Sequence, residues 1–500
     1  MADAKREIER KYEATPDTRL PDLTGVAGIA RVLDKGVADL DAVYYDTGDL
    51  RLARASVTLR RRTGGDDAGW HLKLPVAPGV RDELRAPLED GVPRSLAGLV
   101  RARTRGAALL PLVRLRSRRD VSHLLDGDGA LLAELSTDTV HAERLTGGHG
   151  TAEWTEIEVE LADGGDPAFL DAVHKRLRKA GLRPAGAASK LARALAETGR
   201  PPAAPPEPDT TAGGRVLAYL REQADALVTS DAAVRRDLPD SVHTMRVATR
   251  RMRSAFRTYR KVLDRTVTDS VADELAWLAG ELGADRDQEV LTERLTSRID
   301  ALPVTLLLGP VRGRLRVWAG SGRAGSRGRT LSVLDGERYV ALLNALDALL
   351  ADPPLRPAAA KEADVVLPKA IAKEYGRLAA RVDRALALPA GHDRDLAMHS
   401  ARKAAKRARY AAEAAAPALG KPAKRFAKRM KAVQKVLGEH QDSVVARDTL
   451  RQLAIQAHAA GETAFTWGLL YGQEEARAAR CERELPRVWE EATRGKPWRL

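Results

Sequence analysis

The sequence predicts an α+β N-terminal domain built on an antiparallel sheet or barrel, followed by an all-α domain. Before residue 200, short segments in which apolar and charged residues alternate predominate, which is typical of half-buried strands. After residue 210, long segments rich in Ala, Leu and Arg show helical periodicity. Between them, residues 200–208 read Arg-Pro-Pro-Ala-Ala-Pro-Pro-Glu-Pro, a stiff and extended composition that marks a domain boundary.

Each element is predicted by its own local pattern. The strands are expected within the alternating segments 5–12, 56–62, 70–75, 112–119, 131–140 and 154–161. Two helices are expected between them, near residues 93–105 and 166–181. Residues 320–330 are rich in Gly, Ser and Arg and predict a loop within the helical part.

These patterns give the expected domain organisation. We predict a first domain over residues 3–198, a proline-rich linker over 199–211 and a helical domain over 212–495. The prolines at 353, 354 and 357 divide the helical domain into halves at about residues 212–350 and 360–495.

Composition narrows the expected partners and location. The chain has 83 Lys and Arg against 69 Asp and Glu, a net charge of +14, which attracts polyanions such as nucleic acid, anionic lipid or polyphosphate. The single Cys481 excludes an intramolecular disulfide and suggests a reducing compartment. A secretory signal is not apparent, and no apolar run reaches the roughly 18 residues of a membrane span. We therefore expect a cytoplasmic protein without a membrane partner.

The predicted strands carry charge on one face, and the two signs are separated. Acidic residues recur two apart at Glu7 and Glu9 and again at Glu156, Glu158 and Glu160. Basic residues recur in the same way at Arg60 and Arg62, His71 and Lys73, and Arg114 and Arg116. Glutamates on one strand face repel one another unless a cation lies between them. Mg²⁺ or Mn²⁺ suits such oxygen ligands, and the basic rows suit phosphate, so a metal-bound triphosphate is the predicted substrate type.

The same residues resemble a known family. The motif Glu7-x-Glu9-x-Lys11 near the N-terminus is similar to the hallmark of the CYTH domain, of the triphosphate tunnel metalloenzyme superfamily. The resemblance covers roughly residues 3–198 and continues in chain order. It includes Tyr45-Asp46-Thr47, Leu59 to Arg62, Trp70 to Pro75, Arg81-Asp82-Glu83, Arg116 to Arg119, Asp138, Glu156 to Glu160 and Ser189-Lys190.

The resemblance implies an eight-stranded antiparallel β-tunnel with polar residues inside. It implies the metal ligands Glu7, Glu9, Glu158 and Glu160, with Asp138 holding a metal-bound water or orienting a lysine. The phosphate-binding residues that it implies are Lys11, Arg60, Arg62, Lys73, Arg116, Arg119 and Lys190. Glu7, Glu9, Lys11, Glu158 and Glu160 would be the catalytic set, with one metal ion clamping the triphosphate and a second activating water. A salt bridge to an arginine of the tunnel is an equal alternative for Glu156, and solvent exposure is one for Arg114.

The helical domain contains a duplicated basic segment. Residues 243–254 and 399–410 align on their histidines, so that His243, Arg246, Arg250 and Arg253 match His399, Arg402, Lys406 and Arg409. Spacings of 3, 7 and 10 residues fall on one helix face. Because like charges at these spacings destabilise a helix, the stripes indicate a bound anion. A second repeat pairs Leu282 to Asp287 with Leu437 to Asp442.

The duplicated segments resemble the CHAD domain over roughly residues 212–495. That family binds inorganic polyphosphate in a basic cleft. The resemblance assigns binding to His243, Arg246, Arg250, Arg253, His399, Arg402, Lys406 and Arg409, helped by Lys424 and Lys428. Asp287 and Asp442 are expected to brace the basic residues. The alternative for each histidine is a hydrogen bond to the other half of the domain, without a ligand.

The leading hypothesis is a divalent-metal enzyme that hydrolyses inorganic triphosphate or short polyphosphate, with a polyphosphate-binding domain attached. A non-catalytic polyphosphate-binding or targeting protein is the second hypothesis. A thiamine or nucleotide triphosphatase and a class IV-type adenylate cyclase remain open, because a fold does not fix a substrate. Nucleic acid is disfavoured, since the basic stripes lack interleaved aromatic residues. The location is predicted as cytoplasmic, with polyphosphate granules as an open possibility, and the oligomeric state is not predicted.

Overall fold

The computed structural model describes residues 3–202, 209–323 and 326–495 of the chain. The chain divides into two compact units, Met1–Pro206 and Glu207–Leu500. Residues 203–208 of the predicted linker lie outside the described residues. Each unit has its own core and is described by itself.

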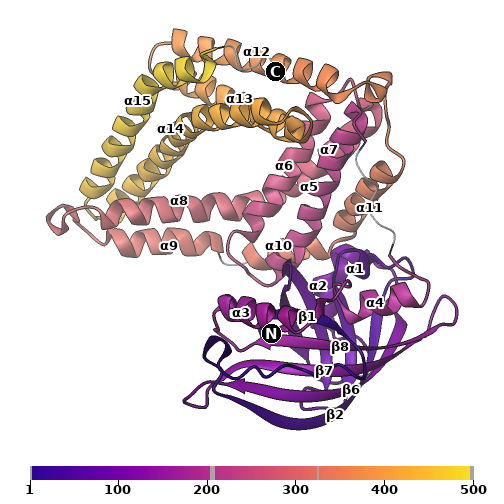
Figure 1. The fold of residues 1–500 in the computed structure, drawn as a ribbon. Coiled ribbons are helices and arrows are strands. Elements are labelled where there is room, and N and C mark those ends of the chain that lie inside the picture. Colours follow the sequence, from indigo (N-terminus) through magenta and orange to yellow (C-terminus); the bar gives the residue numbers. More distant parts are fainter. Residues whose placement is uncertain (1–2, 203–208, 324–325, 496–500) are drawn as a thin grey trace. The chain divides into compact units, whose positions relative to one another are not determined.

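The first unit is an antiparallel β-barrel (Figure 1). Its strands are β1 Asp3–Ala14, β2 Arg31–Asp46, β3 Thr58–Thr63, β4 Gly69–Ala77, β5 Val80–Ala86, β6 Leu110–Leu125, β7 Leu131–Arg144, β8 Thr151–Leu161 and the short β9 Arg183–Pro184. The strand order is β5-β4-β3-β2-β6-β7-β8-β1-β9, and a further pairing of β1 with β5 closes the sheet. The predicted eight-stranded antiparallel barrel is confirmed, with β9 added at its edge.

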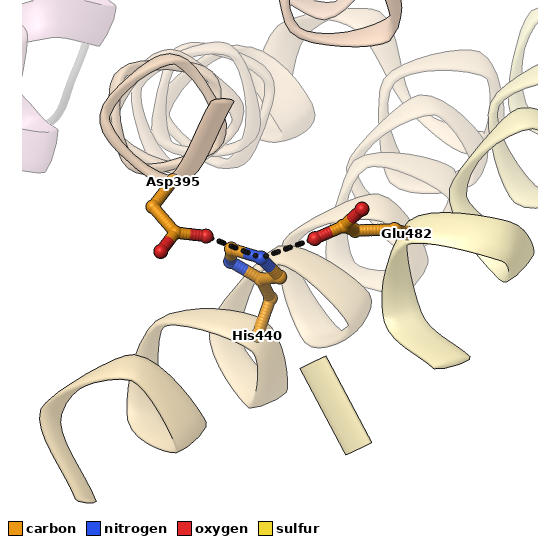
Figure 2. Close-up of side chains that lie close together, drawn as sticks. All are labelled: Asp395, His440 and Glu482. Carbon is orange, nitrogen blue, oxygen red and sulfur yellow. Dashed lines mark ion pairs between the residues drawn. The ribbon is translucent and has the colours of Figure 1, made fainter. Parts of the chain in front are cut away.

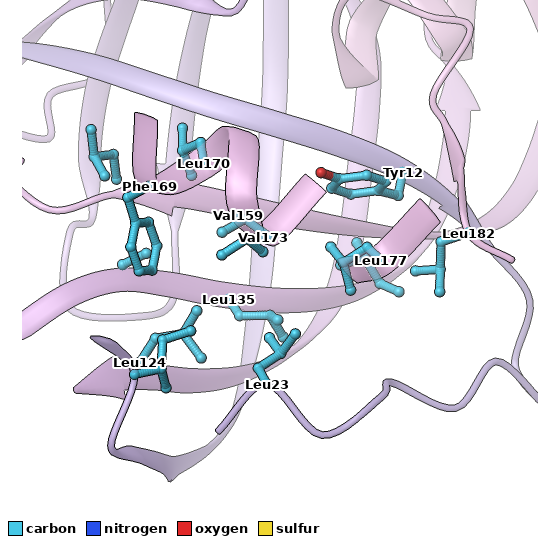
Figure 3. Close-up of a cluster of buried hydrophobic side chains, with 14 residues drawn as sticks. Tyr12, Leu23, Leu124, Leu135, Val159, Phe169, Leu170, Val173, Leu177 and Leu182 are labelled. Carbon is cyan, nitrogen blue, oxygen red and sulfur yellow. The ribbon is translucent and has the colours of Figure 1, made fainter. Parts of the chain in front are cut away.

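Helices cover parts of the outer wall. They are α1 Arg51–Arg54, α2 Arg94–Thr104 and α3 Pro167–Lys179, with a 3₁₀ turn, η1, at Val26–Gly28. The fourth helix of this unit, α4 Lys190–Glu197, lies elsewhere. Phe169, Leu170 and Val173 of α3 pack on Ile157 and Val159 of β8, in the cluster that Figure 3 shows. Helix α2 covers β3, β4 and β5 in the same way. Apolar outward faces on these strands are therefore buried, which leaves the inward faces free to be polar.

Helix α4 packs against the inward face of the barrel wall. Leu191 and Leu195 belong to one buried cluster with Val113, Leu115 and Trp154. Strand alternation places Val113 and Leu115 on the face of β6 that also carries Arg119, and Trp154 on the face of β8 that carries Glu158. One part of the interior is thus apolar and filled by α4, and the other part is charged.

The second unit is all-helical, as predicted. Its α-helices are α5 Ala212–Arg235, α6 Ser241–Thr258, α7 Arg265–Glu281, α8 Gly283–Asp300, α9 Val311–Arg323, α10 Ser326–Asp335, α11 Glu337–Ala351, α12 Ala363–Ala387, α13 His392–Leu419, α14 Lys421–Ala459 and α15 Phe465–Thr493. Short 3₁₀ turns are η2 Val304–Leu306 and η3 Pro357–Ala360. Among the described residues, none of these helices is long and apolar enough to cross a membrane.

The predicted loop at 320–330 is wrong over its described part. Helix α9 continues to Arg323 and α10 begins at Ser326, while residues 324–325 lie outside the described residues. Glycine and serine lower helix propensity by about 1 kcal/mol or less per residue, and apolar residues on these helices supply compensating burial, such as Leu315 of α9 and Leu334 of α10.

The duplicated basic segments form helices α6 and α13, which contact each other. Most of the buried residues of α13 are alanines, including Ala401, Ala405, Ala408 and Ala412. Small side chains allow close packing, and α13 lies against α12, α14, α5 and α6. The Tyr259 hydroxyl, just after α6, donates a 2.6 Å hydrogen bond to the Ala411 carbonyl. The two basic stripes are therefore brought to one region of the unit.

Candidate functional site

The barrel encloses a cavity of about 260 Å³ with a strongly charged lining. Alternation along β1 turns Glu7, Glu9 and Lys11 inward, and Ile8 and Tyr12 outward against α3. The predicted site residues that line the cavity are Glu7, Glu9, Lys11, Arg60, Arg62, Lys73, Arg119, Glu158, Glu160 and Lys190.

Carboxylates from β1 and β8 meet across one strand pair. Glu9 lies directly opposite Glu160, and Lys11 lies opposite Glu158. Burial raises the pKa of Glu7, and the charges of Glu83 and Glu160 add to this rise against the opposing field of Lys73. The carboxylates are thus close enough to repel one another.

This carboxylate group fits the metal ion that the fold implies. Glu7, Glu9, Glu158 and Glu160 offer only oxygen donors, the ligand type that Mg²⁺ and Mn²⁺ prefer. Each of the four lines the same cavity. The Lys73 ammonium lies 2.5 Å from Glu7, and the Lys11 ammonium lies 3.2 Å from Glu9, so protein cations balance part of the negative charge.

A second carboxylate group surrounds Lys190 at the start of α4. Asp138, Glu156 and Glu158 offer oxygens within 4.8 Å of one another, which is close enough for a cation. The Lys190 ammonium lies 2.9, 2.8 and 2.6 Å from these three residues in turn. Burial lowers the pKa of Lys190, but the fields of the three carboxylates outweigh it and the pKa is raised. A protein cation therefore occupies the centre of this group.

Asp138 contacts two basic side chains of the site, Arg119 and Lys190. It is fully buried and accepts two 2.7 Å hydrogen bonds from Arg119, besides its contact with Lys190. Arg119 also donates a 2.9 Å bond to Glu158. Of the roles predicted for Asp138, the orientation of a lysine corresponds to the observed contact. Glu156 forms a salt bridge, but its partner is Lys190 and not the tunnel arginine that was the expected alternative.

Basic side chains crowd the cavity and alternate with the carboxylates, as in the pairs Lys73–Glu7, Arg119–Glu158 and Arg62–Asp67. Burial and the neighbouring charges of Arg60 and Arg119 lower the pKa of Arg62 to about 9. Arg60 donates a 3.2 Å hydrogen bond to the Tyr44 hydroxyl. Crowded cations of this kind gain free energy when an anion binds between them, and guanidinium groups suit phosphate oxygens.

The prediction for Arg116 is wrong. Arg116 is exposed and does not line the cavity, whereas Arg119 does. Residues two apart share a strand face, so Val113, Leu115, Ser117 and Arg119 point inward and Arg116 points outward. Arg114 is also outside, where it pairs with Asp41.

Sequence reasoning assigned no role to Glu83, which the structure places at the centre of a network. It accepts a 2.9 Å hydrogen bond from His71 Nδ1 and a 2.6 Å bond from Arg85, and lies 3.6 Å from the Lys73 ammonium. His71 is therefore a neighbour of the site, and burial lowers its pKa to about 4. The period-two pattern of Arg81, Glu83 and Arg85 on β5 was the available signal.

The helical unit has a second charged cavity, of about 640 Å³. Helices α6, α7, α12 and α13 contribute its walls. Its basic lining residues are Arg250, Arg253, Arg257, Arg260, Arg265, Arg377, Lys403, Lys406 and Arg407. Asp269 and Asp273 are the acidic residues among the described lining, so the cavity is strongly cationic. We call it the basic cavity.

The two stripes meet at Lys406. Burial and the charges of Arg402, Arg250 and Arg409 lower the pKa of Lys406 to about 7. Arg250 belongs to α6 and Lys406 to α13, so cations from both duplicated segments lie close to each other at this point. Of the residues predicted to bind polyphosphate, Arg250, Arg253 and Lys406 line the basic cavity.

The other predicted residues lie elsewhere on their helices. Arg246 is 3.0 Å from Asp287, and Arg402 is 3.4 Å from Asp442, so the predicted braces are present in both halves. Each arginine also lies against a glycine of the second repeat, Gly283 or Gly438. Arg409 pairs with Glu413 at 3.4 Å.

Histidines and the lysines of α14 complete the predicted set. His243 is exposed on α6, and His399 is partly buried on α13 with burial lowering its pKa. Lys424 and Lys428 are exposed on α14 and are not part of the basic-cavity lining. The residues that sequence reasoning missed, such as Arg260, Arg265 and Arg377, come from segments outside the repeats.

Comparisons with known proteins agree with this division. Residues 5–195 match the family described as the CYTH domain, and residues 218–451 match the family described as the CHAD domain. An uncharacterized protein of Mycobacterium tuberculosis (strain CDC 1551 / Oshkosh) is 41% identical over 497 residues, which cover 96% of this chain and 94% of that protein. An uncharacterized protein of strain ATCC 25618 / H37Rv shows the same identity and coverage.

Two solved structures are similar to part of the chain. PptA from Streptomyces chartreusis has a TM-score of 0.48 and 22% identity, covering 56% of this chain and 99% of that one. The CHAD domain from the plant Ricinus communis has a TM-score of 0.46 and 25% identity, covering 58% of this chain and 94% of that one.

Proposed function

Because the chain belongs to the family in which a CYTH domain, here residues 5–195, precedes a CHAD domain, here residues 218–451, we propose a two-part function. The barrel hydrolyses inorganic triphosphate or short polyphosphate with Mg²⁺ or Mn²⁺. The helical unit binds polyphosphate chains in its basic cavity. The chain is therefore a phosphoric anhydride hydrolase with a binding module for a polymeric form of its substrate.

One observation carries the proposal for the barrel. A single small cavity combines an oxygen-only carboxylate group on β1 and β8 with basic residues on β3, β4, β6 and α4. A metal-bound phosphate chain satisfies both sides, because the metal ion meets the carboxylates and the free phosphate oxygens meet the arginines and lysines.

The residues that line the cavity have different roles in this proposal. Glu7, Glu9, Glu158 and Glu160 would hold the metal ion, which when bound neutralises phosphate charge and makes water a better nucleophile. Arg60 and Arg119 would fix the phosphate oxygens, and Asp138 holds Arg119 and Lys190 in position. Water attacks the terminal phosphorus and releases a proton to the solvent, the anhydride P–O bond breaks, and the leaving oxygen keeps the electron pair.

The cavity lining favours an inorganic substrate. Among its described lining residues Tyr44 is the aromatic one, and its hydroxyl is engaged by Arg60. A nucleobase or thiazolium ring needs an apolar or aromatic surface to stack on. We therefore rank adenylate cyclase and thiamine triphosphatase activity below inorganic triphosphatase activity.

The test for the barrel is phosphate release from four substrates: inorganic triphosphate, thiamine triphosphate, ATP and long-chain polyphosphate. Each is assayed with Mg²⁺, with Mn²⁺ and with excess EDTA. We expect the highest kcat/KM with triphosphate and no release in EDTA. Preference for ATP or thiamine triphosphate, or release that persists in EDTA, would contradict the proposal. Binding of triphosphate without any release would favour the non-catalytic alternative.

The test for the helical unit is a competition titration. Full-length protein is titrated with fluorescent long-chain polyphosphate and with duplex DNA at the same salt concentration, since both affinities depend on salt. We expect polyphosphate to bind more tightly. Arg253→Gln, in the basic cavity, should weaken binding, whereas Arg451→Gln, exposed on α14, should leave it unchanged. Equal effects of the two variants would show a diffuse surface attraction instead.

A further inference from the structure

Three side chains from three helices converge in the helical unit, away from the basic cavity. Asp395 lies on α13, His440 on α14 and Glu482 on α15 (Figure 2). His440 Nε2 is 3.2 Å from Asp395 Oδ1 and 3.4 Å from Glu482 Oε1. The three ligand atoms all lie within 4.8 Å of one another.

His440 is fully buried, yet its ring lacks good hydrogen bonds. Within the described part of the chain, neither Nδ1 nor Nε2 has a partner with hydrogen-bond geometry. A buried polar group without a partner costs about 1–3 kcal/mol, so such a group is usually satisfied by something further. Figure 2 shows Nε2 directed between the two carboxylates. The ring is thus aimed at the place where a bound cation would lie.

The two separations from His440 suit a tetrahedral metal ion. Ligand bonds of about 2.0 Å put neighbouring ligand atoms of a tetrahedron about 3.3 Å apart. The two measured separations from His440 Nε2 are 3.2 and 3.4 Å. One imidazole nitrogen with two carboxylate oxygens is a ligand set that zinc and similar divalent transition metals accept.

Two arginines contact the carboxylate oxygens that do not face His440. Arg447 donates a 2.9 Å hydrogen bond to Asp395 Oδ2, and Arg394 lies 3.2 Å from Glu482 Oε2. The oxygens that face His440 are the opposite ones, Oδ1 and Oε1. Outer contacts of this kind fix the orientation of ligating groups. The inner oxygens are therefore held in position and kept available.

We propose that Asp395, His440 and Glu482 form a binding site for a divalent transition-metal ion of the zinc type, which ties α13, α14 and α15 together. The site is independent of the proposed hydrolase, because its donor set contains a nitrogen and none of its residues lines the barrel or the basic cavity. The competing arrangement is an ion-paired imidazolium that needs no metal.

Co²⁺ and Zn²⁺ distinguish the two arrangements in the full-length protein. After chelation and dialysis, wild type is titrated with Co²⁺, and visible d–d bands are recorded. Tetrahedral Co²⁺ absorbs strongly, whereas six oxygen ligands in the barrel would give only weak bands. We expect strong bands that one equivalent of Zn²⁺ abolishes, and a rise in Tm on Zn²⁺ addition.

Isosteric variants test whether the Co²⁺ absorption bands come from this site. Glu482→Gln should lose the bands and one equivalent of bound Zn²⁺, because loss of a ligand should lower the affinity by at least the roughly 10–100-fold that loss of an outer contact costs. Glu491→Gln is the matched control on the same helix, where Glu491 pairs with Arg487 on the surface. Asp395→Asn is the second variant if Glu482→Gln does not give the helical circular dichroism of wild type. Absence of strong bands in wild type, or their retention in both site variants, would overturn the proposal.

Discussion

The Lys190 ammonium lies 2.6 Å from Glu158 Oε1, at the point where α4 meets the charged part of the barrel interior. The next residue, Leu191, is in the apolar cluster that fills the other part. Lys190 therefore lies at the boundary between the apolar core that α4 helps to form and the charged cavity. Asp138 and Glu156 share the same ammonium group, so its removal leaves three carboxylates short of a counter-charge.

Lys190→Met should lower the free energy of unfolding by about 3–5 kcal/mol at neutral pH, the usual cost of removing one partner from a buried ion pair. Burial raises the pKa of Asp138, and in wild type Lys190 and Arg119 more than offset that effect. Urea unfolding followed by circular dichroism measures the change. Lys175→Met, exposed on α3, serves as the control and should be close to wild type. Equal midpoints for both variants would show that Lys190 is dispensable.

Arg119 and Arg116 provide a paired test of which face of β6 is functional. Arg119→Lys keeps the charge but loses the two-pronged geometry that holds Asp138 and suits phosphate. We expect kcat/KM for triphosphate to fall about ten-fold or more, or ~1.4 kcal/mol. Arg116→Lys, on the exposed face, should leave kcat/KM unchanged. The assignment of faces fails if Arg116→Lys has the larger effect.

Polyphosphate binding should weaken as pH rises through neutrality. The pKa of Lys406 is lowered to about 7 in the unliganded protein, and a bound anion raises it. The cationic form binds, so affinity is highest below pH 7 and should fall about ten-fold between about pH 6 and pH 8. Long polyphosphate chains are used in this titration, because the terminal phosphates, whose charge changes near neutral pH, contribute little to the total charge of a long chain.

Lys406→Met is the control for this pH dependence. It should bind more weakly at pH 6 and show a flatter profile, measured by the same titration. The stability of the unliganded protein should change with pH in the opposite direction to its affinity for polyphosphate. Since the folded pKa of Lys406 lies below its ordinary value of 10.5, the unfolded state binds more protons between the two values, and the free energy of unfolding should rise with pH there. An unchanged pH profile in Lys406→Met would exclude Lys406 as the titrating group.

Sequence alternation predicted the strands and the division of polar and apolar faces, but it does not say which face lies inside. In β1 and β8 the charged face is inside, and the predicted residues line the cavity. In β6 the same reasoning put Arg114 and Arg116 on the charged face, whereas the inward face carries Val113 and Leu115 before it reaches Arg119. The difference arises because α4 fills part of the interior, and a single strand contains no information on that contact.

Contacts between distant segments limited the prediction of the helical unit. The repeat predicted that Asp287 and Asp442 brace basic residues, and in the structure they pair with Arg246 and Arg402 of the duplicated segments. Arg265 and Arg377 of the basic cavity come from helices outside those motifs. Their place depends on how α7 and α12 pack, which periodicity alone does not determine.

The central claim is that the inward carboxylates of β1 and β8 hold the metal ion for triphosphate hydrolysis. Glu160→Gln tests it most directly, because Glu160 lines the cavity and is only half-buried, so the barrel should tolerate the change. Glu153→Gln is the matched control, exposed on the opposite face of the same strand.

The measurement is phosphate release from inorganic triphosphate with Mn²⁺, alongside polyphosphate binding by each variant. Glu160→Gln should lose about 100-fold or more in kcat, the scale expected when one electrostatic element of an active site is removed, and keep polyphosphate binding. Glu153→Gln should match wild type in both. Wild-type release by Glu160→Gln at every Mn²⁺ concentration would contradict the account.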